Sequence, residues 1–320
     1  MNTIKISAIE VERLAGNISI REIVDFLEDI LINSYNGNIK VTDKIVTPPE
    51  NGKSYHFHLE LETVDNEGVK VRKVIDEKKP DGMNIEKNTL VTLLRLDKKY
   101  EISGDSITDI RTGVAGALAA KYLTENPEVI AIIGAGKVPR QFALVANYLF
   151  RPKEIRFATR SEKSRIEFYE FLKKNTNAEI QAYDVFNLDH RKRLLKDANI
   201  LFEAAPLKKE SADIRLRLEE IKLMKAGAHI SSMTGDGNQN NFHRDVLLDS
   251  YIVVDDEKSA RKNSELRHLA EKEGKVIGNL FDAAAGKLDM YKNNSTFYDS
   301  SGNASLDRLA ELIVKFYEKG

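Results

Sequence analysis

Apolar residues recur at helical spacing in several segments of the chain. Residues 19–35 repeat an apolar residue every three or four positions behind Ser19, a residue type that often caps a helix N-terminus. A second helical pattern fills residues 106–123, and a third, DRLAELIVKFYEKG, lies at residues 307–320. In the first segment the apolar positions are Ile20, Val24, Leu27 and Leu31. We expect the third helix to pack back on the N-terminal part of the chain.

Between about residues 38 and 102 the pattern changes to short apolar and β-branched runs. The segments PPENG, DNEG and KKPDGMN separate these runs and are typical of turns. The runs predict strands at residues 38–47, 54–64, 68–76 and 89–96. This strand-rich block is therefore expected to be an architecture of its own.

From residue 128 onward, strand and helix patterns alternate regularly as far as YIVVD at residues 251–255. Regular alternation of this kind is typical of a parallel sheet flanked by helices. We predict an α/β protein with a Rossmann-type doubly wound parallel sheet domain at residues 119–289. Residues 1–118 and 290–320 are predicted to form an α+β domain built from both chain ends. The polar stretch at residues 256–275 is expected to be a solvated helix.

Composition and charge narrow the class of protein. The 320 residues are 42% hydrophobic and 31% charged, which is typical of a globular protein long enough for two domains. A formal net charge of −1 argues against a nucleic-acid surface, and without cysteine there is no disulfide or thiol nucleophile. No apolar run approaches the roughly 20 residues of a membrane span. Because the N-terminus also lacks a signal-peptide pattern, we expect a cytoplasmic protein without a nucleic-acid or membrane partner.

The strongest chemical motif is the glycine turn in EVIAIIGAGKVPRQ. In a dinucleotide-binding turn the first glycine permits the tight turn and the second lets the backbone approach the pyrophosphate. Gly134 and Gly136 keep these two roles, and Pro139 stands where a third glycine is usual. A proline is tolerated in the first turn of the following helix, whose free amides can still bind phosphate. The turn therefore predicts a nicotinamide or flavin nucleotide site.

The end of the next strand bears on the choice of coenzyme. An acidic residue is usual there when NAD is selected, because it holds the ribose hydroxyls. Here the strand ends in Thr159, Arg160 and Ser161. Arginine suits a 2′-phosphate, and a solvated helix start is the alternative interpretation. We expect NADP(H) in preference to NAD(H).

Lys73 is a second candidate for chemistry. In VKVRKVID it is in phase with the apolar residues of the strand, whereas Lys70 and Arg72 share the other face. Burying a lysine on an apolar face costs free energy unless the lysine pairs with another charge or takes part in the chemistry. Burial also favours a role in acid–base catalysis. An edge strand with both faces half exposed to water is the alternative.

One strand face in YHFHLELE is polar throughout. Imidazoles and carboxylates two residues apart could ligate a metal, could form the polar face of a half-buried strand, or could line a substrate pocket. We favour the polar face and expect no metal site. The residues are His56, His58, Glu60 and Glu62.

Taken in order, several motifs resemble the ornithine cyclodeaminase/μ-crystallin family. They are DIRTGVAGALAAKYL, AIIGAGKVPRQ, FATRSEKS, KAGAHISSMTGD and FYDSSG. The resemblance implies a homodimer in which a mixed-sheet domain contacts the substrate and a Rossmann domain binds NAD(P). Members of that family include ornithine and lysine cyclodeaminases, alanine and arginine dehydrogenases, ketimine reductases and μ-crystallins.

The resemblance also implies roles for single residues. Lys73 matches a catalytic lysine, and Asp236 matches an aspartate that activates water or relays a proton, although a plain turn aspartate is the alternative. The implied substrate-binding residues are Lys44, Glu60, Arg111 and Ser301. The implied cofactor-binding residues are Thr89, Arg111, Thr112, Gly134, Gly136, Lys137, Val138, Thr159, Arg160, Ser161 and Ser300.

Two departures from the family pattern leave the substrate more open than the cofactor. After its aspartate the family usually reads Pro-Gly-Lys-x-Glu, whereas this chain has Asn240 at the lysine position and Phe242 at the acidic one. Lys44 falls near a carboxylate-binding arginine of the family. A lysine ammonium lacks the planar fork with which a guanidinium binds both oxygens of a carboxylate.

We therefore expect an NAD(P)-dependent oxidoreductase that acts by hydride transfer at the α-carbon of a small amino or cyclic imino acid. Lys73 would handle the substrate proton, Arg111 and Lys44 would hold the carboxylate, and Asp236 would relay a proton or water. One alternative is an ornithine or lysine cyclodeaminase with transient hydride transfer and ammonia release. The other is a non-catalytic NADPH-dependent binding protein resembling μ-crystallin.

Overall fold

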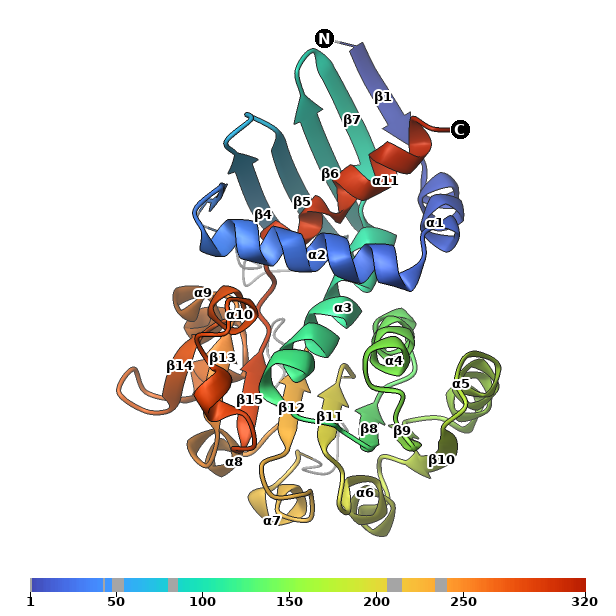
Figure 1. Cartoon of the computed structure of the whole chain (residues 1–320), viewed down its shortest axis with the longest axis vertical. Coiled ribbons are helices and arrows are strands. Elements are labelled where there is room, and N and C mark those ends of the chain that lie inside the picture. Colours follow the sequence, from blue (N-terminus) through green and yellow to red (C-terminus); the bar gives the residue numbers. More distant parts are fainter. Residues whose placement is uncertain (1, 43, 48–54, 80–85, 206–214, 234–240) are drawn as a thin grey trace. The chain divides into compact units, whose positions relative to one another are not determined.

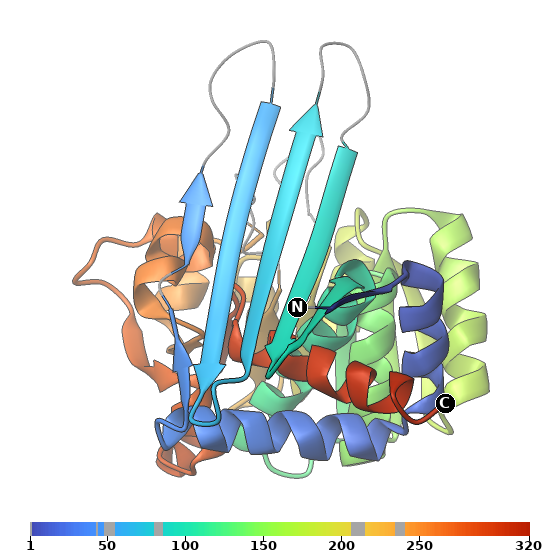
Figure 2. The ribbon, with the colours of Figure 1, turned by 90° about the horizontal axis from the view of Figure 1, so that it is seen from above.

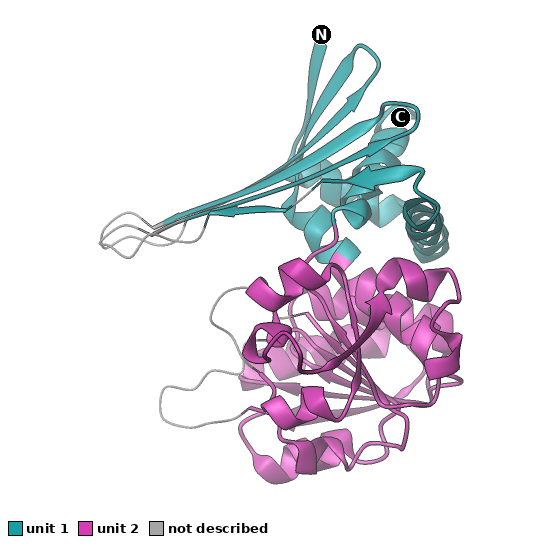
Figure 3. Ribbon diagram, turned by 90° about the vertical axis from the view of Figure 1, so that its left-hand side faces the viewer, with its two compact units in different colours: residues 1–111, 304–320 teal, residues 112–303 magenta. Residues whose placement is uncertain are grey.

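The computed structural model describes residues 2–42, 44–47, 55–79, 86–205, 215–233 and 241–320. The chain forms two units, drawn in different colours in Figure 3. Unit 1 comprises Met1–Arg111 with Ala304–Gly320, and unit 2 comprises Thr112–Asn303. Helix α3 (Asp105–Leu123) spans the residues at which the chain passes from one unit to the other.

Within the described residues of unit 1, the strands form one mixed sheet of seven. Strand β1 pairs with β7 in parallel, and the other pairs are antiparallel. The order is β1 (Asn2–Ile6), β7 (Lys98–Ser103), β6 (Glu86–Arg95), β5 (Lys70–Lys79), β4 (Tyr55–Asp65) and β2 (Ile39–Val41), with β3 (Ile45–Thr47) also on β4. Three of the four predicted strand segments are confirmed as β4, β5 and β6, whereas the segment at residues 38–47 forms two short strands, β2 and β3. Strands β1 and β7 were not predicted, because both are short and β7 carries three charged residues.

Helices α2 (Ile20–Tyr35) and α11 (Leu309–Tyr317) pack against each other, and α11 also contacts β6 (Figures 1 and 2). The predicted cap of α2 is confirmed: Ser19 and Glu22 form a reciprocal capping box. Helix α1 (Ala8–Asn17) contacts α11, and the 3₁₀ turn η3 (Ser305–Arg308) contacts α2 and β5. The C-terminal helix therefore packs back on the N-terminal block, as predicted.

Unit 2 contains an all-parallel sheet of eight strands within the described residues. The order is β10 (Glu179–Asp184), β9 (Glu154–Thr159), β8 (Val129–Ile133), β11 (Ile200–Glu203), β12 (His229–Ser232), β15 (Thr296–Asp299), β13 (Tyr251–Val254) and β14 (Lys275–Asn279). Its helices are α4 (Lys137–Phe150), α5 (Glu162–Asn175), α6 (Leu188–Leu195), α7 (Leu218–Ile221), α8 (Arg244–Leu248), α9 (Glu257–Asn263) and α10 (Leu280–Ala284), with 3₁₀ turns η1 (Glu265–His268) and η2 (Asp289–Tyr291). The predicted α/β class with a Rossmann-type sheet is confirmed.

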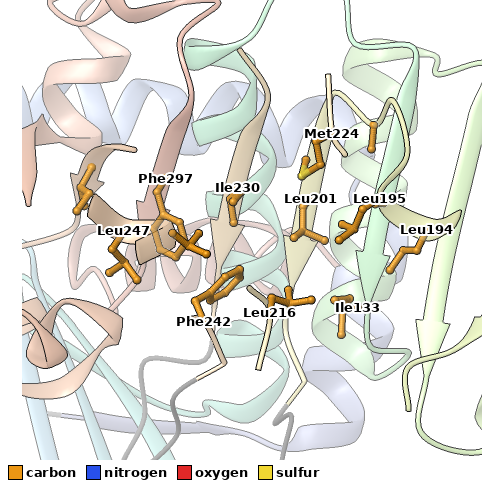
Figure 4. Close-up of a cluster of buried hydrophobic side chains, with 14 of the residues drawn as sticks. Ile133, Leu194, Leu195, Leu201, Leu216, Met224, Ile230, Phe242, Leu247 and Phe297 are labelled. Carbon is orange, nitrogen blue, oxygen red and sulfur yellow. The ribbon is translucent and has the colours of Figure 1, made fainter. Parts of the chain in front are cut away.

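A continuous apolar core holds this sheet together, and Figure 4 shows part of it. Residues Leu201, Ile230 and Phe297 come from neighbouring strands and contact apolar side chains of the segments that flank the sheet. Phe242 and Phe297 meet edge to face with ring centroids 5.0 Å apart. No helix in the described part of the chain is both long enough and apolar enough to cross a membrane.

Two sequence-based expectations differ from the structure. The stretch at residues 256–275 is not one solvated helix, because α9 ends at Asn263 and Ser264, Glu265 and Leu266 are buried. The cause is a tertiary partner: Asp299 accepts hydrogen bonds from the Ser264 hydroxyl and the Leu266 backbone. The units divide after residues 111 and 303 rather than after residues 118 and 289. Residues 290–303 belong to unit 2 because β15 lies between β12 and β13 in the parallel sheet.

Candidate active site

Lys73 is buried at the centre of the sheet of unit 1. It lies on β5 opposite Leu61 of β4 and Val91 of β6, and its side chain is 1% exposed. Its ammonium donates a hydrogen bond to Asp307 Oδ1 at 2.9 Å. The predicted position on the apolar strand face is therefore confirmed, and an edge strand is excluded.

Arg111, on α3, reaches the same carboxylate. Its Nε lies 3.3 Å from Asp307 Oδ1, and its side chain is 7% exposed. Two of the predicted site residues, Lys73 and Arg111, are thus brought together by a residue that the sequence analysis missed. A pattern that could have revealed Asp307 is the acidic residue inside the apolar segment ASLDRLAEL, where burial requires a charged partner.

The turn that holds Asp307 is anchored by its neighbour Arg308. The Arg308 guanidinium pairs with Asp65 and Glu311 and donates to the Val69 carbonyl at 3.3 Å. Asp65 in turn accepts hydrogen bonds from the backbone N–H of Val69, which shapes the β4–β5 hairpin. The hairpin that positions Lys73 therefore also fixes the turn that positions its counterion.

Two buried polar atoms of unit 1, one of them on the strand face of Lys73, have no hydrogen-bond partner among the described residues. Thr89, predicted to contact cofactor, is two positions from Val91 on β6 and therefore shares the face of Lys73. Within the described residues, Thr89 Oγ1 and Asp307 Oδ2 are buried and have no hydrogen-bond partner. Because buried polar groups are normally satisfied, these atoms indicate a place for a ligand.

Glu60 lies on the opposite face of the sheet from Lys73. Its carboxylate is 2.6 Å from Arg72, and this hydrogen bond lowers the pKa of Glu60. On the same face, His58 Nδ1 is 2.8 Å from Asp76 Oδ1 and Lys70 is 3.2 Å from Glu62. The polar face at His58, Glu60 and Glu62 is therefore a row of side chains that pair with one another, while the His56 side chain lies outside the described residues. Lys44 is half-buried between β2 and β3.

In unit 2 the glycine turn follows β8, as predicted. Gly134 has φ +115°, and an added Cβ would lie 3.1 Å from Pro139 Cγ and 3.2 Å from the Ala204 carbonyl oxygen. Gly136 is the N-cap of α4 without a side-chain cap, and an added Cβ there would meet nothing within 4 Å. Open backbone at a helix N-terminus fits a pyrophosphate. Lys137, Val138 and Pro139 form the first turn of α4.

Thr112, the predicted phosphate contact, lies beside this turn. The next residue, Gly113, packs so closely on α4 that an added Cβ would lie 2.8 Å from the Val138 carbonyl oxygen. A side chain at residue 113 would therefore push α3 away from the N-terminus of α4. The structure brings Thr112, Gly134, Gly136 and Val138 into one region of unit 2.

The end of β9 is organised by local hydrogen bonds. The buried Thr159 hydroxyl donates to the Ser161 carbonyl at 2.9 Å, and Ser161 caps α5 by accepting from the Ser164 backbone. Arg160 between them is exposed. The guanidinium therefore extends from a fixed backbone at the strand end where a ribose is bound in Rossmann folds.

The predicted Ser300 and Ser301 follow β15 and are buried. Asp255, at the end of β13, accepts hydrogen bonds from the Tyr298 hydroxyl at 2.5 Å, Ser300 Oγ at 2.9 Å and the Gly302 backbone at 2.8 Å. The sequence analysis did not identify Asp255. Its hydrogen bonds fix the turn that contains both serines.

Further carboxylates are buried at the carboxyl ends of the parallel strands. Asn241 joins two of them: its side chain donates to Glu203 at 3.0 Å and its backbone donates to Glu265 at 2.7 Å. Burial raises the pKa of Glu265 to about 8 and that of Asp299 to about 6. This end of the sheet is where open α/β folds bind ligands. The predicted Asp236 lies outside the described residues.

A model of the ornithine cyclodeaminase/mu-crystallin family matches residues 5–316. The chain belongs to this family. Over 186 residues it is 30% identical to an uncharacterized cyclodeaminase of Sinorhizobium fredii. The matched region covers 57% of this chain and 50% of that protein. Over 219 residues it is 26% identical to an alanine dehydrogenase of Archaeoglobus fulgidus. The matched region covers 65% of this chain and 62% of that protein. The chain thus spans between half and two thirds of these two relatives.

Solved structures share the fold over nearly the whole chain. An archaeal alanine dehydrogenase dimer with bound NAD has a TM-score of 0.80 at 19% identity, covering 100% of this chain and 97% of that one. The Δ1-pyrroline-2-carboxylate reductase of Thermococcus litoralis, in complex with NADH and L-proline, has a TM-score of 0.78 at 21% identity, covering 99% and 98%. At these identities the likeness establishes the fold.

Proposed function

We propose that the protein is an NAD(P)-dependent oxidoreductase that acts at the α-carbon of a small amino or cyclic imino acid. The observation that carries this proposal is the buried cluster of unit 1, where the Lys73 ammonium and the Arg111 guanidinium lie against one carboxylate. Such a pair suits a small substrate with a carboxylate and an adjacent nitrogen. Family membership and the open glycine turn of unit 2 support the coenzyme.

The chain's own residues have distinct roles in this proposal. Arg111 binds and orients the substrate carboxylate, and Lys73 holds a proton at the substrate nitrogen. Burial excludes water and strengthens both interactions. Asp236 relays a proton or activates water. When bound, the nicotinamide supplies or accepts the hydride at the α-carbon.

We further propose that NADP(H) is the preferred coenzyme and that the protein is a homodimer. The exposed Arg160 at the end of β9 supports the coenzyme preference, because a guanidinium can bind a 2′-phosphate with two hydrogen bonds. The dimer is supported by the archaeal alanine dehydrogenase, whose structure is described as a dimer.

Cyclodeamination of ornithine or lysine is the second candidate, because one relative is named a cyclodeaminase. Phe242 argues against it. Where the family usually has an acidic residue, this side chain is 1% exposed and packs in the apolar core of unit 2. No carboxylate can therefore act from that position.

The two reactions differ in their balance and can be separated by one experiment. Reduction of a cyclic imine consumes one reduced coenzyme and one proton for each amino acid formed, whereas cyclodeamination releases one ammonium and leaves the coenzyme unchanged. The protein is incubated with NADPH or NADH and either Δ1-pyrroline-2-carboxylate or pyruvate plus ammonium, and separately with ornithine plus traces of NADP+ or NAD+. We expect loss of reduced coenzyme in at least one of the first reactions. Ammonia from ornithine without net reduced coenzyme would reverse the choice. Coenzyme binding without any turnover would favour a binding protein.

A further inference from the structure

Arg140 connects the glycine turn of unit 2 to the neighbouring helix α5. It lies in α4, in the helical turn that follows Gly136. Its Nε donates a hydrogen bond to the Ala135 carbonyl oxygen at 3.4 Å. The centre of its guanidinium also lies 4.9 Å from the centroid of the Phe171 ring, a cation–π contact. The guanidinium is therefore held from two sides, by the turn and by an aromatic ring.

The Phe171 ring is itself held by the core of unit 2. It stacks on Phe168 with ring centroids 5.9 Å apart and an angle of 8° between the ring planes. Phe168 meets Phe157 of β9 edge to face at 4.9 Å, and both of these rings are fully buried. An arginine that stacks on a fixed ring has few alternative rotamers, so its Nε–H is directed at the turn before a ligand binds.

The hydrogen bond from Arg140 sets the direction of one peptide group of the turn. A trans peptide carries its C=O and its N–H on opposite sides, and none of the described peptide bonds is cis. Because the Ala135 carbonyl faces Arg140, the N–H of Gly136 faces away from it. The preceding N–H, of Gly134, donates instead to the Ala158 carbonyl at 3.0 Å. Arg140 thus orients the Gly136 N–H at the N-terminus of α4.

Arg140 also brings positive charge to the turn. Within the described residues the structure gives its guanidinium no ion pair with a carboxylate. A positive charge at this end of a helix adds to the helix dipole and favours a bound anion. The same side chain therefore supplies the orientation of a donor and a charge of the sign that a diphosphate requires.

We propose that Arg140 is a positioning residue of the coenzyme site, which directs the peptide between Ala135 and Gly136 for binding of the dinucleotide diphosphate. The proposal rests on the proposed function and adds a residue that lies outside the glycine motif. It assigns Arg140 to the diphosphate, which NADP(H) and NAD(H) both carry, whereas Arg160 is assigned to the 2′-phosphate. Loss of Arg140 therefore weakens the two coenzymes alike.

The test is equilibrium binding of ADP, NAD+ and NADP+ to the full-length protein, with adenosine as the ligand that lacks a diphosphate. Arg140→Met keeps an apolar stem on Phe171 and removes the donor and the charge, and Arg140→Lys keeps the charge without the Nε–H. Arg151→Met is the matched control, because Arg151 is exposed at the other end of α4. The urea midpoint of each ligand-free variant reports its stability.

We expect Arg140→Met to weaken ADP, NAD+ and NADP+ at least tenfold each, the effect of one lost charge-assisted contact. Adenosine should be weakened less than twofold, and the urea midpoint should match that of the wild type. Arg140→Lys should remain at least threefold weaker than the wild type for ADP. Arg151→Met should match the wild type for every ligand.

The proposal is overturned if Arg140→Met binds ADP within twofold of the wild type, or if it loses ADP and adenosine by the same factor, as a packing defect would produce. Weakening of NADP+ alone would also overturn it, because Arg140 would then bind the 2′-phosphate. Full recovery in Arg140→Lys would show that charge suffices without orientation and would overturn it too. A wild type that binds neither coenzyme nor ADP would overturn the coenzyme site of the proposed function, and this proposal with it.

Discussion

Lys73 Nζ lies 2.9 Å from Asp307 Oδ1, and neither side chain is more than 2% exposed. The two residues are far apart in sequence and come from a strand of the first block and a turn of the C-terminal segment. Their pairing is one of the contacts that join the C-terminal segment to the sheet of unit 1. A lysine in the middle of a sheet is tolerated there because its counterion arrives from the other end of the chain.

Replacing Lys73 by methionine should abolish activity without unfolding the protein. The Arg111–Asp307 pair that remains is neutral, so we expect the free energy of unfolding to change by less than about 2 kcal/mol. Loss of the proton at the substrate should lower kcat/KM by about 100-fold or more. Lys70→Met is the matched control, since Lys70 lies on the other face of the same strand. Equal kinetics for the two variants would remove Lys73 from the site.

The two glycines of the turn should respond differently to alanine. Gly136→Ala should keep the stability of the wild type, because its added Cβ meets no protein atom, but should weaken coenzyme binding at least tenfold by blocking the pyrophosphate. Gly134→Ala should destabilise unit 2 by about 1–3 kcal/mol, because its φ of +115° strains any L-residue. Chemical denaturation and coenzyme fluorescence measure the two effects. Unchanged coenzyme affinity in Gly136→Ala would exclude this turn as the phosphate site.

Arg160→Ala should change the preference between coenzymes. Loss of a charge-assisted contact of about 1.5–3 kcal/mol corresponds to at least a tenfold weaker NADP+ affinity. NAD+ affinity should change less than threefold, because NAD+ has no 2′-phosphate. Lys173→Ala removes the same charge from the last turn of α5 and should leave both affinities unchanged. A parallel loss for both coenzymes would contradict the 2′-phosphate assignment.

Glu265 should make the protein less stable as pH rises. Its pKa is about 8 when folded against 4.5 in the unfolded chain, so the folded state retains a proton between these values. The stabilising contribution of the Glu265 carboxyl is fully present below about pH 4.5. It declines towards pH 8, by at most about 1.4 kcal/mol for each pH unit. Glu265→Gln, which carries no titrating proton, should show a flatter profile between pH 5 and 8.

The urea midpoint measured against pH checks this linkage. Glu219→Gln serves as the control, because Glu219 is exposed on α7 and its removal should leave the wild-type profile unchanged. Parallel profiles for the wild type and Glu265→Gln would show that the buried carboxyl does not hold its proton in the folded state.

Local patterns were sufficient to predict most of the fold. Strands, turns and capped helices depend on periodicity and on neighbouring residues, so α2, β4 to β6 and the βα series followed from the sequence alone. The glycine turn was predicted for the same reason, because its requirement for Gly134 is a local backbone conformation. The fully buried Lys73 also followed from strand alternation.

Partners from distant segments could not be predicted in this way. Asp307 reads as one more charge on an amphipathic helix, and its contact with Lys73 exists only after the C-terminal segment returns to the sheet. Glu265 lies in a polar stretch that looks solvated, yet Asp299 and Asn241 draw that stretch into the core. Burial of single polar residues depends on tertiary contacts that a local pattern does not contain.

The most direct test of the central claim is transfer of deuterium from C4-deuterated NADPH or NADH to the product. Both stereoisomers of each labelled coenzyme are supplied with Δ1-pyrroline-2-carboxylate, or with pyruvate and ammonium, and the amino acid formed is analysed by mass spectrometry. We predict one deuterium at the α-carbon from one stereoisomer and none from the other. An amino acid product without deuterium from either stereoisomer would contradict hydride transfer at the α-carbon.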